Sequence, residues 1–341
     1  MENNNKGSVF VPEGYKSNLS LRETEVAIKK VKDYFQVEFS KALNLTRVSA
    51  PLFLESNSGL NDKLNGVERP VAFDMKAIEN SNIEIVHSLA KWKRYALYKY
   101  KFNVGEGLYT DMNAIRRDED LDNLHSIYVD QWDWEKIIAK DERNVDTLKS
   151  VVKTIYGVLK NTEEYVASEY PTLEKVLPEE ISFITTQELE DMYPDMTSKE
   201  RENAICREKK AVFLMQIGDK LLSGKKHDGR SPDYDDWKLN GDILLYNPLF
   251  DGAFEVSSMG IRVNKEALEE QLKKAGCEDR KKLYFHKLLL EEKLPQTIGG
   301  GIGQSRICMF FLRKAHIGEV QSSIWDDNTV KTCEDAGIKL L

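Results

Sequence analysis

The succession of predicted strands constrains the fold of this chain more than any other feature. Segments 242–246 and 253–257 flank the turn signals Asn247-Pro248 and Asp251-Gly252, which predicts a β-hairpin. Further strands are predicted at 46–53, 71–75, 83–86, 108–115, 126–134 and 211–217. Because these strands do not alternate regularly with helices, the sequence favours an α+β fold with a mainly antiparallel sheet flanked by helices. It disfavours a Rossmann fold.

Capping signals and helical periodicity predict the helices that cover this sheet. Ser20 and Glu23 form the capping-box pattern S-x-x-E, and apolar residues then recur at helical spacing to about residue 44. Other helices are predicted at 88–100, 145–169, 186–193, 198–209, 265–275, 279–292 and 305–312. Pro51 interrupts the first predicted strand, because proline cannot donate a hydrogen bond to a strand ladder.

The cysteines and the apolar segments indicate in which cellular compartment the protein is expected. No apolar run approaches the roughly 18 residues that span a bilayer, so no membrane association is expected. The first residues, MENNNKGSVF, lack the layout of a secretory signal. A cytoplasmic location is therefore expected, with neither a zinc site nor a disulfide framework. The four scattered cysteines, which form no C-x-x-C pair, are Cys206, Cys277, Cys308 and Cys333.

The charge distribution argues against nucleic acid as a partner. The formal net charge is −8, whereas nucleic-acid affinity comes mostly from neutralising phosphates. Lys91, Lys93 and Arg94 cluster on the helix predicted at 88–100. Charges on a helix usually face solvent, so a solvated face is the default interpretation of this cluster.

A glycine-rich segment, GGGIGQSR at 299–306, is the strongest candidate for a nucleotide site. Its glycines let a backbone approach a ligand closely, and the helix that follows offers free N–H groups to an anion. Arg306 adds a planar charge suited to phosphate. The segment matches neither a Walker A loop nor a dinucleotide fingerprint. A tight strand–helix junction that needs small residues is an equally good interpretation of the glycines alone.

Carboxylates on the predicted hairpin suggest a magnesium site. Asp242 and Glu255 lie on its two arms, and Asp235 lies in the loop that precedes it. One or two carboxylates together with phosphates are a usual arrangement for Mg²⁺. The alternative is a structural ion pair with Arg262.

Two further polar groups admit a functional and a structural interpretation. Arg116 ends a predicted strand and precedes acidic residues 118–120, so it could hold an α-phosphate or lie in a salt-bridged surface turn. Gln131 and Asp133 lie on one face of an otherwise apolar strand. They could bind the charged groups of an amino acid, or form a buried hydrogen-bond network.

The order of these segments resembles that of class II aminoacyl-tRNA synthetases. Segment 28–53 resembles motif 1, segment 116–120 resembles motif 2 and segment 299–306 resembles motif 3. Longer blocks resemble the ammonia-dependent asparagine synthetases, that is, the aspartate–ammonia ligases. These blocks are VHSLAKWKR (86–94), GEGLYTDM (105–112), HSIYVDQWDWE (125–135), PDYDDW (232–237), LNGDIL (239–244), SSMGIRV (257–263) and PQTIGGGIGQSR (295–306).

The resemblance implies a fold, an assembly and a reaction. It implies a class II synthetase-like core, formed here by residues 19–341 as one domain. Residues 1–18 are themselves expected to form a flexible or loosely docked lead-in. A homodimer would form through the motif 1 region. The aspartate β-carboxylate would attack the α-phosphorus of ATP, giving β-aspartyl-AMP and pyrophosphate. Ammonia would then attack the acyl carbon, giving L-asparagine and AMP.

The resemblance also implies roles for individual residues. Arg116 would contact the α-phosphate, and Arg306 the nucleotide phosphates or the substrate carboxylate. Asp62 would bind ammonium and take its proton. The implied catalytic residues are Asp62, Arg116, Gln131 and Arg306. The implied aspartate pocket is Ser88, Lys93, Gln131, Asp133 and Ser258. The implied nucleotide site is Arg116, Asp235, Asp242, Glu255, Gly299, Gly301, Gly303 and Arg306, with Asp242 and Glu255 as the Mg²⁺ ligands.

Two competing functions remain open at this point. An aspartyl- or asparaginyl-tRNA synthetase shares the adenylation step, but the sequence suggests no separate anticodon-binding module. A synthetase-like regulator without catalysis would be expected to lack the phosphate-binding arginines, whereas Arg116 and Arg306 are both present. The second residue is Glu2 rather than a catalytic cysteine, so free ammonia is the expected nitrogen source.

Overall fold

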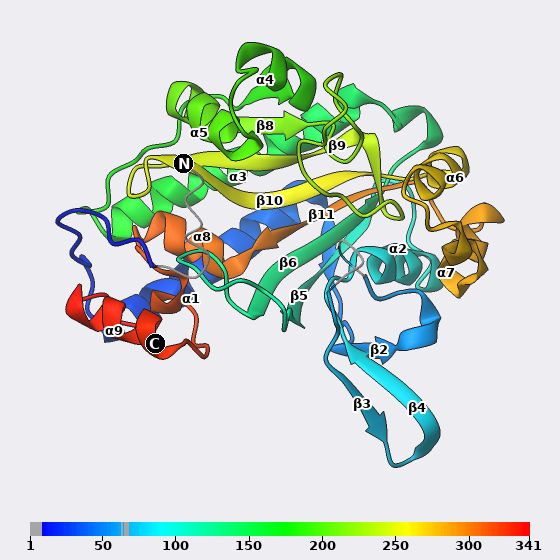
Figure 1. Cartoon of the computed structure of the whole chain (residues 1–341), viewed down its shortest axis with the longest axis horizontal. Helices are drawn as coiled ribbons and strands as arrows, with labels where there is room; N and C mark the ends of the chain where they lie inside the picture. Colours follow the sequence, from blue (N-terminus) through cyan, green and yellow to red (C-terminus); the bar gives the residue numbers. More distant parts are fainter. Residues whose placement is uncertain (1–8, 63, 65–67) are drawn as a thin grey trace.

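An eight-stranded sheet forms the centre of the molecule (Figure 1). The computed structural model describes residues 9–62, 64 and 68–341. Neighbouring strands from β5 to β8 are antiparallel. The edge strand β1 is parallel to its neighbour β5, and the edge strand β7 is parallel to its neighbour β8. The predicted α+β fold is therefore confirmed. In sheet order the strands are β1 (Leu45–Arg47), β5 (Gly107–Ile115), β6 (Tyr128–Ile137), β11 (Thr297–Gly303), β10 (Gly252–Arg262), β9 (Asp235–Asn247), β8 (Ala211–Met215) and β7 (Ser182–Thr185).

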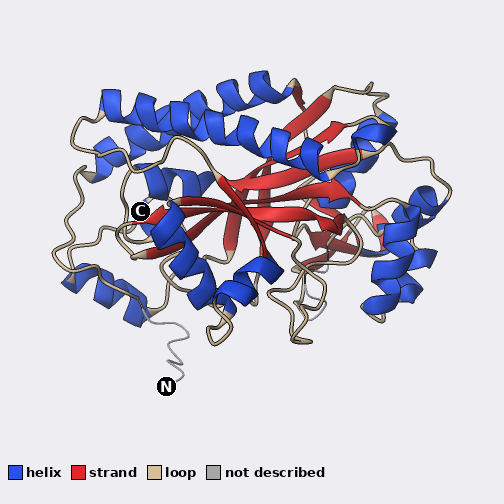
Figure 2. Cartoon of the chain, turned by 90° about the horizontal axis from the view of Figure 1, so that it is seen from above, coloured by secondary structure: helices blue, strands red, loops and turns tan. Residues whose placement is uncertain are grey.

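Two long helices cover one face of this sheet (Figures 1 and 2). They are α1 (Leu21–Leu43) and α3 (Val145–Glu169), and α1 begins at the predicted Ser20–Glu23 capping box. Phe35 of α1 stacks on Trp132 of β6, with ring centroids 4.6 Å apart. Burying an aromatic side chain of this size stabilises a fold by about 1.5–3 kcal/mol, so this apolar layer fixes the position of β6.

The opposite face of β6 carries polar side chains. Because side chains alternate along a strand, Gln131, Asp133 and Glu135 point away from the layer that contains Trp132. Part of this polar face is covered by a second apolar cluster and by short helices. These helices are α2 (Ala90–Lys99), α6 (Lys265–Lys274), the 3₁₀ turn η3 (Glu278–Lys282) and α7 (Tyr284–Leu290).

A smaller sheet and the remaining α-helices complete the fold. A separate three-stranded sheet extends from the body of the molecule (Figure 1). Its strands are β2 (Phe53–Glu55), β4 (Ile78–Ile85) and β3 (Ala72–Met75). The predicted strand at 46–53 is thus divided into β1 and β2 around Pro51. The remaining α-helices are α4 (Thr186–Met192), α5 (Ser198–Lys209), α8 (Gln304–Phe311) and α9 (Asp327–Asp335).

Three local predictions were wrong. The glycine segment 299–303 lies inside the central strand β11 instead of forming a loop. Residues 235–237, expected in a loop, belong to β9. The helix predicted at 279–292 is divided into η3 and α7, because Leu283 adopts an extended conformation with ψ 153°.

Residues 9–18 pack against the C-terminal part of the chain. The backbone N–H of Phe10 donates to Asn123 at 2.7 Å, and the Tyr15 hydroxyl donates to Glu319 at 2.9 Å. Residues 1–8 of the predicted lead-in lie outside the described residues, and the domain boundary at 18/19 stays a prediction. In the part of the chain that the structure describes, no helix is long and apolar enough to cross a membrane.

Candidate active site

A cavity of about 520 Å³ opens on the polar face of the sheet. Strands β6, β10 and β11 contribute to it, together with the start of α2 and loops near residues 116–126 and 229–234. It brings together nearly all of the predicted site residues, with Asp242 and Gly299 as the exceptions. Those that line it are Asp62, Ser88, Lys93, Arg116, Gln131, Asp133, Asp235, Glu255, Ser258, Gly301, Gly303 and Arg306.

The β11 glycines make room for polar side chains of the neighbouring strand. A Cβ on Gly299 would overlap the Glu135 carboxylate. A Cβ on Gly301 would overlap the Gln131 amide and lie 2.8 Å from an oxygen of Asp133. The glycine segment thus ends at the junction of β11 and α8, and Gly301 and Gly303 also line the cavity.

Replacing Gly301 with alanine is expected to abolish aspartate binding and leave the chain folded. The added Cβ displaces the side chains of Gln131 and Asp133 toward the cavity, because β11 is fixed on both sides by backbone pairing. Calorimetric titration with aspartate and thermal unfolding are the two measurements. Gly157→Ala is the matched control, because a Cβ there meets no atom within 4 Å. Aspartate affinity unchanged in Gly301→Ala would contradict this account of the strand.

The basic cluster at the start of α2 is buried, so the predicted solvated face was wrong. Lys91, Lys93 and Arg94 are 3%, 1% and 2% exposed. Each reaches a polar partner across the fold: Lys91 contacts Asp233, and Arg94 donates to two backbone carbonyls. Helix α2 is buried at its start, so these side chains extend into the protein instead of into solvent.

Lys93 and Asp133 form an ion pair that lines the cavity. The Lys93 Nζ lies 3.2 Å from Asp133 Oδ2 and donates to the Gly300 carbonyl at 2.8 Å. Burial lowers the pKa of the Lys93 ammonium, and Asp133 opposes that shift. A buried pair of opposite charges offers complementary partners to the carboxylate and the ammonium of an amino acid.

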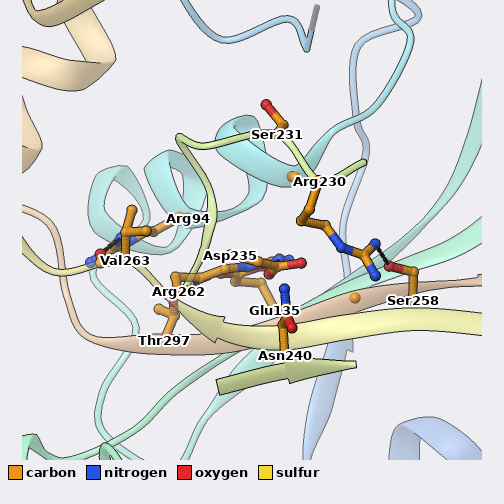
Figure 3. Close-up of polar contacts among 12 residues, drawn as sticks. Arg94, Glu135, Arg230, Ser231, Asp235, Asn240, Ser258, Arg262, Val263 and Thr297 are labelled. Carbon is orange, nitrogen blue, oxygen red and sulfur yellow. Dashed lines mark hydrogen bonds and ion pairs between the residues drawn. The ribbon is translucent and has the colours of Figure 1, made fainter. Parts of the chain in front are cut away.

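A second buried group of opposite charges consists of Arg262, Glu135 and Asp235 (Figure 3). Arg262 contacts Glu135 at 2.7 Å and also pairs with Asp235. The Thr297 hydroxyl donates to Glu135 at 2.7 Å. Burial would raise the pKa of Glu135, but Arg262 lowers it below its usual value. Arg262 thus forms a structural ion pair with Asp235. The sequence had suggested such a pair between Arg262 and the carboxylates of Asp242 or Glu255.

Arg230 is a cavity residue that the sequence did not single out. Its guanidinium donates to Asp242 at 2.6 Å. It also donates to the Ser258 hydroxyl (Figure 3). Asp242 therefore lies behind Arg230 and does not line the cavity. Burial raises the pKa of Asp242 to about 7, while Arg230 opposes the shift and Glu255 adds to it. Arg230 lies two residues before the PDYDDW block, and this position in the sequence was the signal that could have indicated it as a site residue.

Arg116 and Arg306 supply positive charge to the same cavity. Arg306 donates to the Glu255 carbonyl at 2.9 Å, and its other terminal nitrogen lies 2.9 Å from Nε2 of His125. The Glu255 carboxylate is 3.9 Å from Arg306. The Nε of Arg116 is buried and has no hydrogen-bond partner in the described part of the chain. These arginines therefore have donor capacity for an anionic ligand.

The structure offers little evidence of a preformed metal centre. Within residues 9–62, 64 and 68–341, no group of three or more His, Cys, Asp or Glu side chains has metal-binding geometry. Of the two predicted ligands, Glu255 lines the cavity and Asp242 is paired with Arg230.

Solved structures with the same fold are class II synthetases. The chain aligns with asparaginyl-tRNA synthetase from Pyrococcus horikoshii, complexed with asparaginyl-adenylate, at a TM-score of 0.64 and 13% identity; the match covers 89% of this chain and 70% of that one. Aspartyl-tRNA synthetase from Entamoeba histolytica gives a TM-score of 0.60 at 15% identity, covering 90% of this chain and 60% of that one. At these identities the likeness shows the fold alone, and it confirms the class II synthetase-like core.

Sequence comparison is more specific. The aspartate-ammonia ligase family model matches residues 22–337. The aspartate–ammonia ligase of Clostridium perfringens strain 13 is 70% identical over 333 residues, which is 98% of this chain and 99% of the relative. That of Ruminiclostridium cellulolyticum is 67% identical over 334 residues, with 98% and 99% covered. The chain belongs to the aspartate–ammonia ligase family.

Proposed function

We propose that the chain joins free ammonia to the β-carboxylate of L-aspartate at the expense of ATP, through a β-aspartyl-AMP intermediate. Family membership supports the carbon–nitrogen ligase activity. The observation that carries the adenylate mechanism is a single cavity lined by both the Lys93–Asp133 pair and the arginines Arg116 and Arg306. An amino acid and the phosphates of a nucleotide can therefore occupy adjoining parts of one site.

The chemistry of the first step explains the need for this charge. A carboxylate is a poor acyl donor, because oxide would have to leave; attachment of AMP provides a good leaving group. Negative charge develops on phosphate oxygens as the β-carboxylate attacks the α-phosphorus. Arg306 is held in place by Glu255 and His125, and Arg116 lines the same cavity. Donors held in place before the reaction are the main source of transition-state stabilisation in such sites.

Aspartate binding uses the polar face of β6. Lys93 attracts a substrate carboxylate and Asp133 the α-ammonium, while Gln131, Ser88 and Ser258 complete the pocket. Because Lys93 and Asp133 are paired without substrate, aspartate exchanges one set of ionic contacts for another. Specificity then comes from matching both charges at once.

Magnesium is proposed as the cofactor that accompanies ATP. Glu255 provides one carboxylate next to Arg306, and Asp242 would become a second ligand if Arg230 turned toward the phosphates. The bound ion would neutralise phosphate charge. Repulsion between Glu255 and Asp242, which contributes to the raised pKa of Asp242, favours a cation between them. Binding of Mg²⁺–ATP that is unchanged in Glu255→Gln would contradict this ligand assignment.

One incubation tests the proposed reaction. The protein is mixed with ATP, Mg²⁺, aspartate and ammonium, and AMP and asparagine are measured together. Equal amounts of AMP and asparagine are expected without tRNA. Formation of ADP would contradict the adenylate mechanism, a requirement for tRNA would favour a tRNA synthetase, and no turnover would favour a regulator.

A cytoplasmic homodimer formed through the motif 1 region is also proposed. Helix α1 lies in this region and exposes the apolar side chains of Val26 and Val37, at 49% and 56%. Light scattering is expected to give twice the mass of the chain. A monomer at micromolar concentration would contradict this assembly.

A further inference from the structure

A buried cluster of charge surrounds Asp233, next to the active-site cavity. Asp233 is fully buried, and its Oδ2 contacts Lys91 at 3.2 Å, Arg280 at 3.1 Å and His286 at 2.9 Å. These partners come from α2, η3 and α7. Burial alone would raise the pKa of Asp233, but Lys91 and His286 lower it well below its usual value. Asp233 is therefore an ionised carboxylate whose one oxygen contacts Lys91, Arg280 and His286.

Asp62 lies beside this cluster and forms no ion pair with any residue in the described part of the chain. Its side chain is almost completely buried, and its Oδ2 has no hydrogen-bond partner among the residues that the structure describes. Its Oδ1 is 3.3 Å from the Ser231 hydroxyl, whose single hydrogen has a shorter contact of 2.8 Å with Asp233. Burial raises the pKa of Asp62, against an opposing effect of Lys91. Asp62 is thus left as a basic carboxylate with an open oxygen that lines the cavity.

We propose that Asp233 is a positioning residue for the nitrogen half-reaction: by holding Lys91, it prevents this lysine from pairing with Asp62 and keeps Asp62 available to ammonium. The inference rests on the proposed ligase reaction and on Asp62 as the group that binds ammonium. Without the negative charge of Asp233, the Lys91 ammonium would be drawn to the neighbouring Asp62. A carboxylate in a buried ion pair is a weaker base, because the cation stabilises its charged form.

The step needs only ammonium, Asp62 and the β-aspartyl-AMP intermediate. Ammonium gives one proton to the Asp62 carboxylate, and the electron pair of that N–H bond becomes the nucleophile. A C–N bond forms at the β-carbonyl carbon as the bond to the AMP oxygen breaks. A second nitrogen proton leaves with the AMP phosphate. The products are asparagine, AMP and a neutral Asp62, and no other reactant is required.

The alternative is that Asp233 only ties α7 and η3 to the loop that precedes β9. Both interpretations predict that Asp233→Asn loses activity, but only the proposed one predicts which half of the reaction is lost. The first half is followed by aspartate-dependent exchange of pyrophosphate into ATP. The second half is followed with two nucleophiles, namely ammonium, which must lose a proton, and hydroxylamine, which is already neutral near pH 8.

Asp233→Asn is expected to keep pyrophosphate exchange and hydroxamate formation within about threefold, while kcat/KM for ammonium falls by about 10²-fold, a usual effect of a misplaced catalytic group. The double variant Asp233→Asn with Lys91→Met removes the competing cation as well. Its kcat/KM for ammonium is expected to be at least tenfold higher than that of Asp233→Asn. Because the double variant removes Lys91 together with Asp233, it leaves one fewer buried cation unpaired than Asp233→Asn, so it is also less prone to unfold.

Glu190→Gln is the matched control, since Glu190 is a buried carboxylate 3.2 Å from Arg201 and does not line the cavity. It should leave both half-reactions unchanged. Equal loss of exchange and of ammonium use in Asp233→Asn would overturn the proposal, and so would a folded double variant without recovery. If wild-type protein exchanges no pyrophosphate, the proposed function itself fails, which is a separate result.

Discussion

Arg306→Ala is expected to lower aspartate-dependent pyrophosphate exchange by roughly 10²–10³-fold, the usual effect of removing one preorganised donor from an anionic transition state. Arg306 is held at the cavity by the Glu255 carbonyl and lies next to His125. These contacts orient the guanidinium, and the Glu255 carboxylate, 3.9 Å away, is too distant for a hydrogen bond to it. Its positive charge is therefore available to the phosphates, and its loss should damage adenylation itself.

The matched control for Arg306 is Arg207→Ala. Arg207 pairs with Asp251 on the surface and does not line the cavity, so exchange should be unchanged. Circular dichroism of both variants checks that they are folded. An Arg306→Ala variant that exchanges pyrophosphate normally but fails to use ammonium would show that Arg306 acts after the adenylate has formed.

The second large effect concerns stability. Arg262→Met is expected to reduce the free energy of unfolding by about 3–5 kcal/mol, because it leaves two buried carboxylates without their counter-charge. Glu135 and Asp235 both pair with Arg262, and all three side chains are almost completely buried. These three side chains also join β6, β9 and β10 at the cavity, so aspartate binding should be lost as well.

Urea unfolding at pH 7.5 measures this effect, with Arg207→Met as the exposed control. An exposed pair such as Arg207–Asp251 is expected to contribute at most about 1 kcal/mol. If Arg262→Met and Arg207→Met lose equal stability, the Arg262 network is not the structural base of the site.

The elements that were predicted well are those whose ends are determined locally. Helices α3 and α5 have observed bounds that equal the predicted ones. Their N-cap residues, Asn144 and Thr197, accept hydrogen bonds from the first turn through their side chains. The hairpin of β9 and β10 follows from its turn residues, although both strands extend further than predicted. Capping and turn signals involve neighbours in sequence, so they can be identified without knowledge of the fold.

The errors arose where distant residues determine the outcome. The segment 299–303 is a strand because it pairs with β6 and β10, and its glycines are needed to accommodate Glu135, Gln131 and Asp133. Lys91 is buried because Asp233, which is 142 residues away in sequence, receives it. Periodicity cannot reveal such partners.

The candidate site was predicted mainly through the resemblance of its motifs. Nearly all of the residues that these motifs indicated line the cavity, because the blocks that carry them meet at the polar face of the sheet. They did not reveal that Asp235 is paired with Arg262, or that Arg230 separates Asp242 from the cavity. Pairing of buried charges depends on geometry across several strands, and residue type alone does not determine it.

The most direct test of the account follows the oxygen of the aspartate β-carboxylate. Aspartate labelled with ¹⁸O in this carboxylate is incubated with ATP, Mg²⁺ and ammonium, and the phosphorus products are analysed by mass spectrometry. Attack on the α-phosphorus predicts one ¹⁸O atom in AMP for each asparagine formed, and unlabelled pyrophosphate. Labelled inorganic phosphate together with ADP, or AMP without ¹⁸O, would contradict the β-aspartyl-AMP intermediate.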